Sequence, residues 1–231
     1  MQITGPDLSV ESPAPFIDHT LLKPEATAAQ IGEICEEAVE WGFAAVCVPP
    51  AYVALSAEKL YGSDAHVATV VGFPFGYTTS AVKAYETRDA VSRGADEIDM
   101  VMSIGTALSE DWQAVEDDVR AVVEAAEGVP VKVILECSAL PEAVKRMAAE
   151  RALAAGAAYL KTSTGYGVHG ATSSDVRLLH GIAQGQAGVK AAGGIRDLDA
   201  CLLMLSCGAS RIGTSSGVAI MKQWHDRQRE V

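Results

Sequence analysis

The chain has 231 residues, a length that suits one large domain or two small ones, and α/β barrels commonly occupy this length as a single domain. Hydrophobic residues make up 49% and charged residues 21%, which excludes the weakly hydrophobic, highly charged class of disordered chain. The formal net charge of −12 repels nucleic acid as a bulk partner, so an anionic ligand would need a local positive site.

Short apolar runs rich in β-branched residues alternate along the chain with longer segments of helical periodicity. In chain order, we expect strands at residues 16–20, 44–48, 67–72, 97–102, 131–136, 157–162, 189–192 and 211–214. Between them we expect helices at residues 27–41, 80–93, 112–126, 141–155, 173–183 and 198–207. Several of these helices end at a glycine, as expected for a left-handed helix cap: Gly42, Gly94, Gly128, Gly156 and Gly208.

Such alternation produces a parallel sheet with right-handed crossovers. Eight strands in a chain of 231 residues favour a closed barrel over an open, doubly wound sheet. The prediction is an α/β fold, a (β/α)8 TIM barrel that forms a single domain over residues 1–231.

Membrane segments, export signals and disulfides are not expected. No stretch approaches the roughly 18 apolar residues of a membrane span, and the amino terminus lacks the pattern of a signal peptide. We therefore expect a cytoplasmic protein without a membrane partner. The cysteines form no Cys-x-x-Cys pair, and their odd number favours reduced, packed thiols: Cys35, Cys47, Cys137, Cys201 and Cys207.

In a barrel, the carboxyl ends of the strands and the loops that follow them form the active site. The sixth strand (AAYLKTSTG) places Lys161 near the end of an apolar run, and the seventh (VKAAGG) places Lys190 one strand away. Asp99 in EIDMVM can point into the same interior. Burial and a neighbouring cation both lower the pKa of a lysine, so these residues are candidates for an imine-forming site. The residues alone leave a second interpretation open, in which the lysines snorkel or form ion pairs at the barrel rim with Asp99 or Glu136.

Glycines follow the last three strands of the predicted barrel. Gly165 follows the sixth strand, Gly193 and Gly194 follow the seventh, and GTSSG (residues 213–217) follows the eighth. Barrels frequently bind phosphate in the loops after their last two strands, near a helix amino terminus. The histidines lack the short spacings of metal ligands, so no metal site is expected: His19, His66, His169, His180 and His225.

Several segments, in order and over nearly the whole chain, resemble the deoxyribose-phosphate aldolase family. These segments are IDHTLLKPEAT (17–27), VCVPP (46–50), VVGFPFG (70–76), GADEIDMV (94–101), LKTSTG (160–165), VKAAGGIR (189–196) and RIGTSSG (211–217). The resemblance implies a class I, Schiff-base-forming lyase that reversibly cleaves 2-deoxy-D-ribose 5-phosphate to D-glyceraldehyde 3-phosphate and acetaldehyde. It also implies a small sugar-phosphate ligand, no metal or organic cofactor, and a homo-oligomer.

The same resemblance implies roles for individual residues. Lys161 looks like the Schiff-base lysine, Lys190 like the lysine that lowers its pKa, and Asp99 like the group that transfers protons through a water molecule. The residues that look like phosphate ligands are Gly165, Gly193, Gly194, Ser215 and Ser216, and those placed where the family lines its substrate cleft are Asp18, Thr20 and Cys47.

The chain departs from the family pattern at two points. Tyr166 stands after KTSTG, where some members have a lysine, so a second phosphate-binding cation is missing from that position. The sequence ends QWHDRQREV, without the terminal tyrosine that some members use in proton transfer. Proton transfer would therefore rely on Asp99, Lys190 and water.

Two rival functions remain open. One is another imine-forming barrel enzyme that acts on a different sugar phosphate or on a keto acid, because barrels host many chemistries. The other is a noncatalytic barrel that binds a sugar phosphate without forming an imine. A panel of aldehyde donors would distinguish the first rival from a deoxyribose-phosphate aldolase, and a test for imine formation would distinguish the second.

Overall fold

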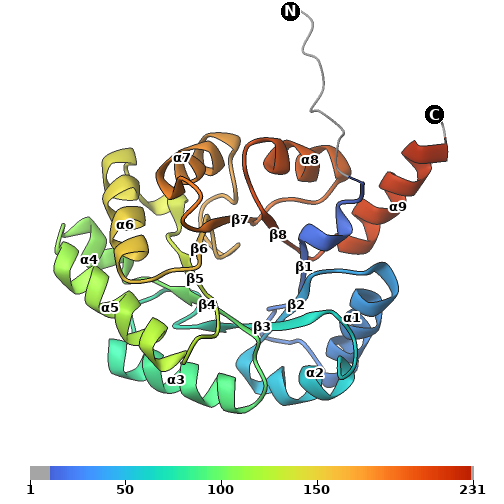
Figure 1. The fold of residues 1–231 in the computed structure, drawn as a ribbon, viewed down its shortest axis with the longest axis horizontal. Coiled ribbons are helices and arrows are strands. Elements are labelled where there is room, and N and C mark those ends of the chain that lie inside the picture. Colours follow the sequence, from blue (N-terminus) through green and yellow to red (C-terminus); the bar gives the residue numbers. More distant parts are fainter. Residues whose placement is uncertain (1–10, 230–231) are drawn as a thin grey trace, which may run out of the picture.

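The computed structural model describes residues 11–229. Eight parallel strands pair in chain order, and β8 pairs with β1 to close the barrel, which helices surround (Figure 1). The strands are β1 (Ile17–Thr20), β2 (Ala45–Val48), β3 (His66–Val71), β4 (Glu97–Val101), β5 (Val131–Ile134), β6 (Tyr159–Lys161), β7 (Gly188–Ala192) and β8 (Arg211–Thr214). The predicted (β/α)8 TIM barrel is confirmed.

The predicted helices are all present, with ends that differ by a few residues. The helices are α1 (Ala28–Trp41), α2 (Val53–Lys59), α3 (Ser80–Ser92), α4 (Ile104–Leu108), α5 (Trp112–Ala125), α6 (Glu142–Ala154), α7 (Ser173–Ala183), α8 (Leu198–Ser206) and α9 (Gly217–Arg229). α2 and α4 were not predicted from the sequence, because both are too short to show a clear helical period, and no bounds were expected for α9. None of the helices in residues 11–229 is long and apolar enough to cross a membrane.

Local signals explain where elements begin and end. Thr27 caps α1 through a capping box with Gln30, and α1 ends at Gly42. The five glycines predicted as helix caps all have positive φ, from +69° at Gly42 to +104° at Gly208. The third strand was predicted to include Gly72 but stops at Val71, because Gly72 has a φ of +61° and leaves the extended conformation.

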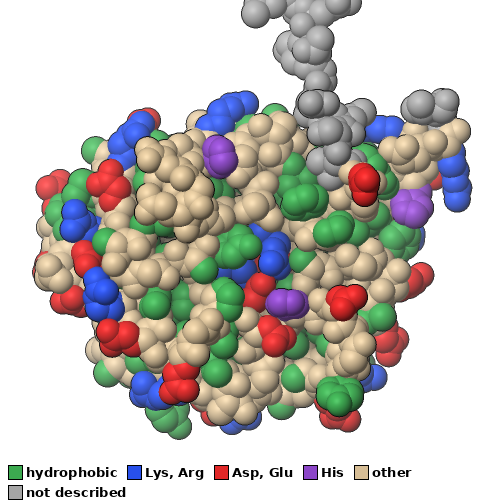
Figure 2. Space-filling view, viewed as in Figure 1, with side chains coloured by type: hydrophobic (Ala, Val, Ile, Leu, Met, Phe, Trp, Pro, Cys, Tyr) green, Lys and Arg blue, Asp and Glu red, His purple; other side chains and the backbone are tan. Residues whose placement is uncertain are grey.

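The barrel interior is unusual because charged side chains occupy much of it. On the β2 and β3 side it is small and apolar, with Ala45, Cys47, Ala68 and Val70 packed together. On the opposite side, glycines leave room for long side chains. A Cβ on Gly188 would lie 2.3 Å from Cε1 of Tyr159, and one on Gly213 would lie 3.0 Å from Cε of Lys190. Figure 2 shows basic and acidic side chains meeting near the centre of one face, inside the ring of helices.

Candidate active site

Seven charged residues from six strands form a connected group inside the barrel, which we call the interior charge cluster. They are Asp18, Glu97, Asp99, Lys132, Lys161, Lys190 and Arg211. All are buried except Arg211, whose side chain is 13% exposed. Taking an ion out of water costs several kcal/mol unless it is well paired, and each carboxylate here contacts at least two cations.

Asp99 lies at the centre of the interior charge cluster. Its Oδ2 accepts hydrogen bonds from Nζ of Lys161 and of Lys190, both at 2.7 Å, and its Oδ1 accepts one from Nζ of Lys132 at 2.8 Å. Burial by itself would raise the pKa of Asp99, but the three lysines hold that pKa well below its ordinary value. Asp99 is therefore ionised, and the structure brings it together with both lysines predicted from the sequence.

The other two carboxylates hold Lys132 and Lys190 in their charged forms. Asp18 contacts Nζ of Lys190 at 2.5 Å, and Glu97 contacts Nζ of Lys132 at 2.5 Å. Burial would lower the pKa of Lys190, but Asp18 and Asp99 raise it above the ordinary value. The pKa of Lys132 is likewise raised, because its carboxylate neighbours outweigh burial and the repulsion from Lys190. Both lysines therefore keep their protons at neutral pH.

Lys161 differs from the other lysines of the cluster in its pairing. Among the carboxylates of residues 11–229 it contacts one, Asp99, whereas Lys190 contacts two and Lys132 contacts three. Burial lowers the pKa of Lys161, and the charge on Lys190 adds to this effect, while Asp99 opposes it. The net direction is downward, with burial as the largest cause. Lys161 is therefore the amine that most readily becomes a neutral nucleophile.

The charge balance of the cluster leads to the same conclusion. Four cations face three carboxylates, so the cluster carries one net positive charge when Lys161 is protonated and none when Lys161 is neutral. An uncompensated buried charge is costly, which favours loss of that one proton. Of the second interpretation, the ion pairing with Asp99 is present for both lysines. Their expected place at an exposed rim is wrong, because Lys161 is 3% exposed and Lys190 is fully buried.

A pocket of about 390 Å³ opens at the carboxyl ends of the strands, above the interior charge cluster. Of the seven cluster residues, Lys161 alone lines it. The predicted ligand residues that also line it are Thr20, Gly165, Gly193, Gly194 and Ser215. Ser216 lines a neighbouring pocket between α1 and α9, while Asp18 and Cys47 are buried and line neither pocket.

One end of the pocket has the features of an anion site. Gly165, Gly193 and Gly194 have φ values of +88°, +85° and +79°, which glycine adopts without strain and which bring their backbone to the pocket wall. Ser215 and Ser216 directly precede the amino terminus of α9, where backbone N–H groups favour an anion.

Two cations that the sequence analysis missed also line the pocket, Lys23 and Arg196. Both are exposed, and within residues 11–229 neither forms an ion pair and no carboxylate lines the pocket. Both residues belong to segments that resemble the aldolase family. The pocket mouth therefore has a local positive charge in a protein of net charge −12.

Tyr166 forms part of the pocket wall and bridges two loops. Its hydroxyl donates a hydrogen bond to the carbonyl of Leu22 at 2.8 Å, and its ring meets that of Phe73 edge-on at 5.5 Å. Burial raises the pKa of Tyr166, so the phenol stays neutral. Behind it, Thr164 bonds to the carboxylate of Glu136, which is therefore a loop brace and not a partner of the lysines.

Sequence reasoning also missed three members of the interior charge cluster, namely Glu97, Lys132 and Arg211. Each is a charged residue at an inward-facing position of a strand: EIDMV, VKVI and RIGT. A charged residue in an otherwise apolar barrel strand was the available signal. That signal does not say which opposite charge each one meets.

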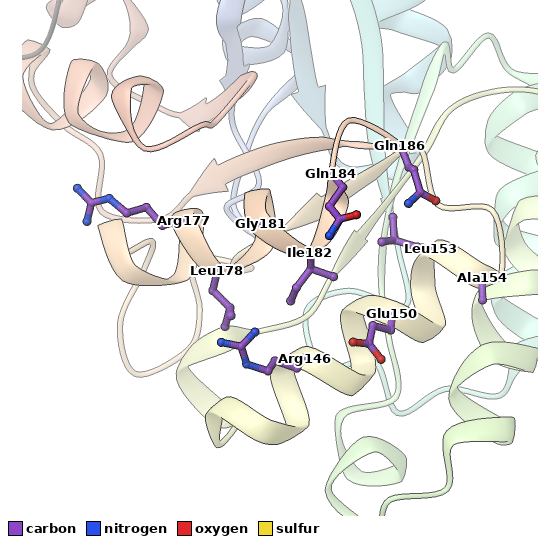
Figure 3. Close-up of a pocket in the computed structure, with 10 residues that line it drawn as sticks. All are labelled: Arg146, Glu150, Leu153, Ala154, Arg177, Leu178, Gly181, Ile182, Gln184 and Gln186. Carbon is purple, nitrogen blue, oxygen red and sulfur yellow. The ribbon is translucent and has the colours of Figure 1, made fainter.

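A second groove, of about 670 Å³, lies on the outer surface between α6 and α7 (Figure 3). Arg146, Glu150, Arg177 and Gln184 are among its lining residues, and Arg146 is paired with Glu142 at 2.9 Å. None of the interior charge cluster lines it. The smaller pocket above Lys161 is therefore the candidate active site.

Comparison with known proteins gives consistent matches along most of the chain. The model for DeoC/LacD family aldolases matches residues 14–223. The deoxyribose-phosphate aldolase of Syntrophotalea carbinolica is 52% identical over 217 residues, which cover 94% of this chain and 98% of that protein. The deoxyribose-phosphate aldolase of Streptococcus equi subsp. zooepidemicus is 53% identical over 207 residues, covering 90% and 94% respectively. The solved structure of a tetrameric deoxyribose phosphate aldolase from Aeropyrum pernix is similar with a TM-score of 0.88 at 32% identity, covering 94% of each chain.

Proposed function

Because the chain belongs to the DeoC/LacD family of aldolases, we propose that it reversibly cleaves 2-deoxy-D-ribose 5-phosphate to D-glyceraldehyde 3-phosphate and acetaldehyde, with Lys161 as the Schiff-base nucleophile. One observation carries this proposal. Within the part of the chain that the structure describes, Lys161 is the member of the interior charge cluster that both lines the pocket and has a single carboxylate partner. It is thus accessible to a ligand and released from its proton more easily than Lys132 or Lys190.

In the proposed reaction, the neutral amine of Lys161 attacks the C1 aldehyde of the open-chain sugar, and loss of water gives a protonated imine. The imine draws the electron pair of the C2–C3 bond as Asp99 accepts the C3 hydroxyl proton through a water molecule. Glyceraldehyde 3-phosphate leaves, and an enamine remains on Lys161. The proton taken from the C3 hydroxyl returns through water to the enamine carbon, and hydrolysis of the resulting imine releases acetaldehyde and regenerates the amine.

The interior charge cluster can stabilise the charges that develop during the proposed reaction. The protonated imine carries one positive charge at the position where the ammonium group stood, so Asp99 at 2.7 Å stabilises it in the same way. Asp99 is ionised, so it can accept the C3 hydroxyl proton but does not retain it. Its low pKa means that it passes the proton on to water, while Lys132 and Lys190 fix its position.

We place the substrate phosphate at the anion site. Backbone amides of Gly165, Gly193 and Gly194 would donate to it, together with Ser215 and Ser216 at the start of α9. Lys23 and Arg196 would add positive charge in place of the lysine that Tyr166 replaces. Thr20 would contact the sugar directly, Asp18 would act on it through Lys190, and Cys47 would lie beneath it.

Trapping of the imine tests the proposal. The protein is incubated with acetaldehyde and borohydride, and its peptides are mapped for an N-ethyl lysine. We expect the ethyl group on Lys161, together with release of glyceraldehyde 3-phosphate from the deoxy sugar phosphate in a separate assay. An adduct on Lys132 or Lys190 instead would overturn the assignment. Trapping without cleavage of this sugar would favour a different imine-forming enzyme, and binding without trapping would favour a noncatalytic barrel.

We also propose that the protein is a cytoplasmic homo-oligomer. The aldolase from Aeropyrum pernix is described as tetrameric, and it is similar to this chain over 94% of its length. Light scattering of the purified protein at several concentrations would give the subunit number, and a monomer at all of them would contradict this part of the proposal.

A further inference from the structure

Arg211 occupies the end of the barrel opposite the pocket. It is the first residue of β8, whereas the pocket is lined by Gly213, Thr214 and Ser215 further along the same chain segment. Its guanidinium donates to Oδ1 of Asp18 at 2.7 Å and to Oε1 of Glu97 at 2.9 Å. Arg211 thus links β8 to β1 and β4 through two carboxylates of the interior charge cluster, without lining the pocket.

Both of these carboxylates are shared with a lysine. Asp18 also contacts Lys190 at 2.5 Å, and Glu97 also contacts Lys132 at 2.5 Å. A guanidinium keeps its charge at any pH at which a protein is folded, so Arg211 is a permanent cation in this group. Arg211, Lys132 and Lys190 together balance the three carboxylates. Lys161 is therefore the surplus cation.

We propose that Arg211 is a positioning residue of the active site: by occupying Asp18 and Glu97 at the far end of the barrel, it makes Lys161 the cation that the cluster releases. This inference rests on the proposed function, in which Lys161 is the nucleophile. Without Arg211, three lysines would face three carboxylates. Each lysine would then be needed to balance a charge, and Lys161 would retain its proton.

Every strand contributes a titratable or charged group to the interior or to its lower end. These groups are Asp18 (β1), Cys47 (β2), His66 (β3), Glu97 and Asp99 (β4), Lys132 (β5), Tyr159 and Lys161 (β6), Lys190 (β7) and Arg211 (β8). Burial raises the pKa of Cys47, so its thiol adds no charge near neutral pH. His66 is exposed and lies 3.7 Å from Glu97, so water screens its charge.

The test reads the ionisation of Lys161 directly and needs no enzymatic turnover. Trace labelling with acetic anhydride is measured across pH, and peptide mass spectrometry gives the reactivity of the Lys161 amine at each pH. The variants are Arg211→Gln, which removes the cation, and Arg211→Lys, which keeps a positive charge. Arg146→Gln is a matched control, because Arg146 lies in the outer groove between α6 and α7.

For Arg211→Gln, we expect the pH midpoint of Lys161 acetylation to rise by about one pH unit or more. Below the midpoint, the reactive fraction of Lys161 would then be roughly tenfold smaller. Arg211→Lys should recover most of the shift, and Arg146→Gln should match the parent. Glu97→Gln should shift the acetylation midpoint of Lys161 in the opposite direction, to lower pH, because removal of a carboxylate increases the surplus positive charge of the cluster. Loss of folding cannot mimic shifts in two directions.

An unmoved midpoint in folded Arg211→Gln would overturn the inference. If Arg211→Gln does not fold, Glu97→Gln decides, and an unmoved or raised midpoint there would overturn it as well. Failure of the proposed function is separate, because it would appear as absent imine trapping on Lys161 or absent sugar cleavage. The acetylation midpoints are measured whether or not those reactions occur.

Discussion

Replacement of Lys190 with Met tests how the interior charge cluster lowers the pKa of Lys161. Met removes the cation but keeps much of the stem volume. Nζ of Lys161 and Nζ of Lys190 both lie 2.7 Å from Oδ2 of Asp99, so the two charges are close neighbours. Two unit charges about 4.5 Å apart at an effective dielectric of about 20 repel by roughly 3.7 kcal/mol. At ~1.4 kcal/mol for each pKa unit, loss of Lys190 would raise the pKa of Lys161 by up to about 2.6 units.

The charge balance of the cluster gives the same sign. Without Lys190, three cations face three carboxylates, and Asp99 attracts the ammonium form of Lys161 with one competitor fewer. A raised pKa means that less of Lys161 is neutral at pH 7 and that the neutral fraction recovers at higher pH. Burial, the largest cause of the lowered pKa, remains in the variant. We therefore expect a partial shift of one to about 2.6 units.

The assay is kcat/KM for cleavage of 2-deoxyribose 5-phosphate between pH 6 and about 9.5, within the range over which the variant stays folded. The acidic limb of the profile should move upward, and the rate should approach the parent value at the alkaline end. Lys59→Met is the control, because Lys59 is exposed on α2 and lies outside the cluster. A uniform loss at every pH, with an unmoved limb, would mean that Lys190 donates a proton or positions the sugar, and the electrostatic account would be refuted.

Three further predictions concern the anion site, the pocket wall and acid stability. Ser216→Asp places like charge near the phosphate, so the preference for phosphorylated over free deoxyribose should largely disappear; a variant that keeps the full preference places the phosphate elsewhere. Tyr166→Phe removes the hydrogen bond to Leu22 and should raise KM by a factor that corresponds to about 0.5–1.5 kcal/mol. Tyr166→Lys should instead lower KM, and the effect should weaken as the salt concentration rises. Equal KM values in the two variants would argue against a nearby phosphate. The pKa values of Asp18 and Asp99 are lowered on folding, so the two carboxylates stabilise the fold above about pH 4 and lose this effect as the pH falls further. Urea unfolding between pH 3 and 6 should therefore show a free energy of unfolding that declines toward the acidic end. A free energy of unfolding that does not change with pH would contradict this prediction.

The sequence by itself determined the fold and the identity of the central residues. Segments with the two-residue period of a strand alternate with segments of helical period, and glycines such as Gly42 and Gly208 mark helix ends. These signals can be read from the sequence because they depend on local backbone geometry. Lys161 and Lys190 were detectable for a related reason. Both are lysines in short apolar strands next to glycine-rich loops; the residues alone left ion pairing open as the explanation, and the family segments supplied the remaining context.

Only the tertiary structure decided which charges meet. Asp18 and Arg211 are separated by 193 positions, and their contact depends on closure of the barrel by β8 against β1. Alternation along one strand shows that a side chain points inward, but the register and tilt of all the strands decide which inward residues share a level. The pairing of Glu97 with Lys132 and Arg211 follows from that geometry, as does the single carboxylate partner of Lys161. The pairing of charges in the cluster depends on contacts between segments that are far apart in the chain, and local sequence patterns do not reveal those contacts.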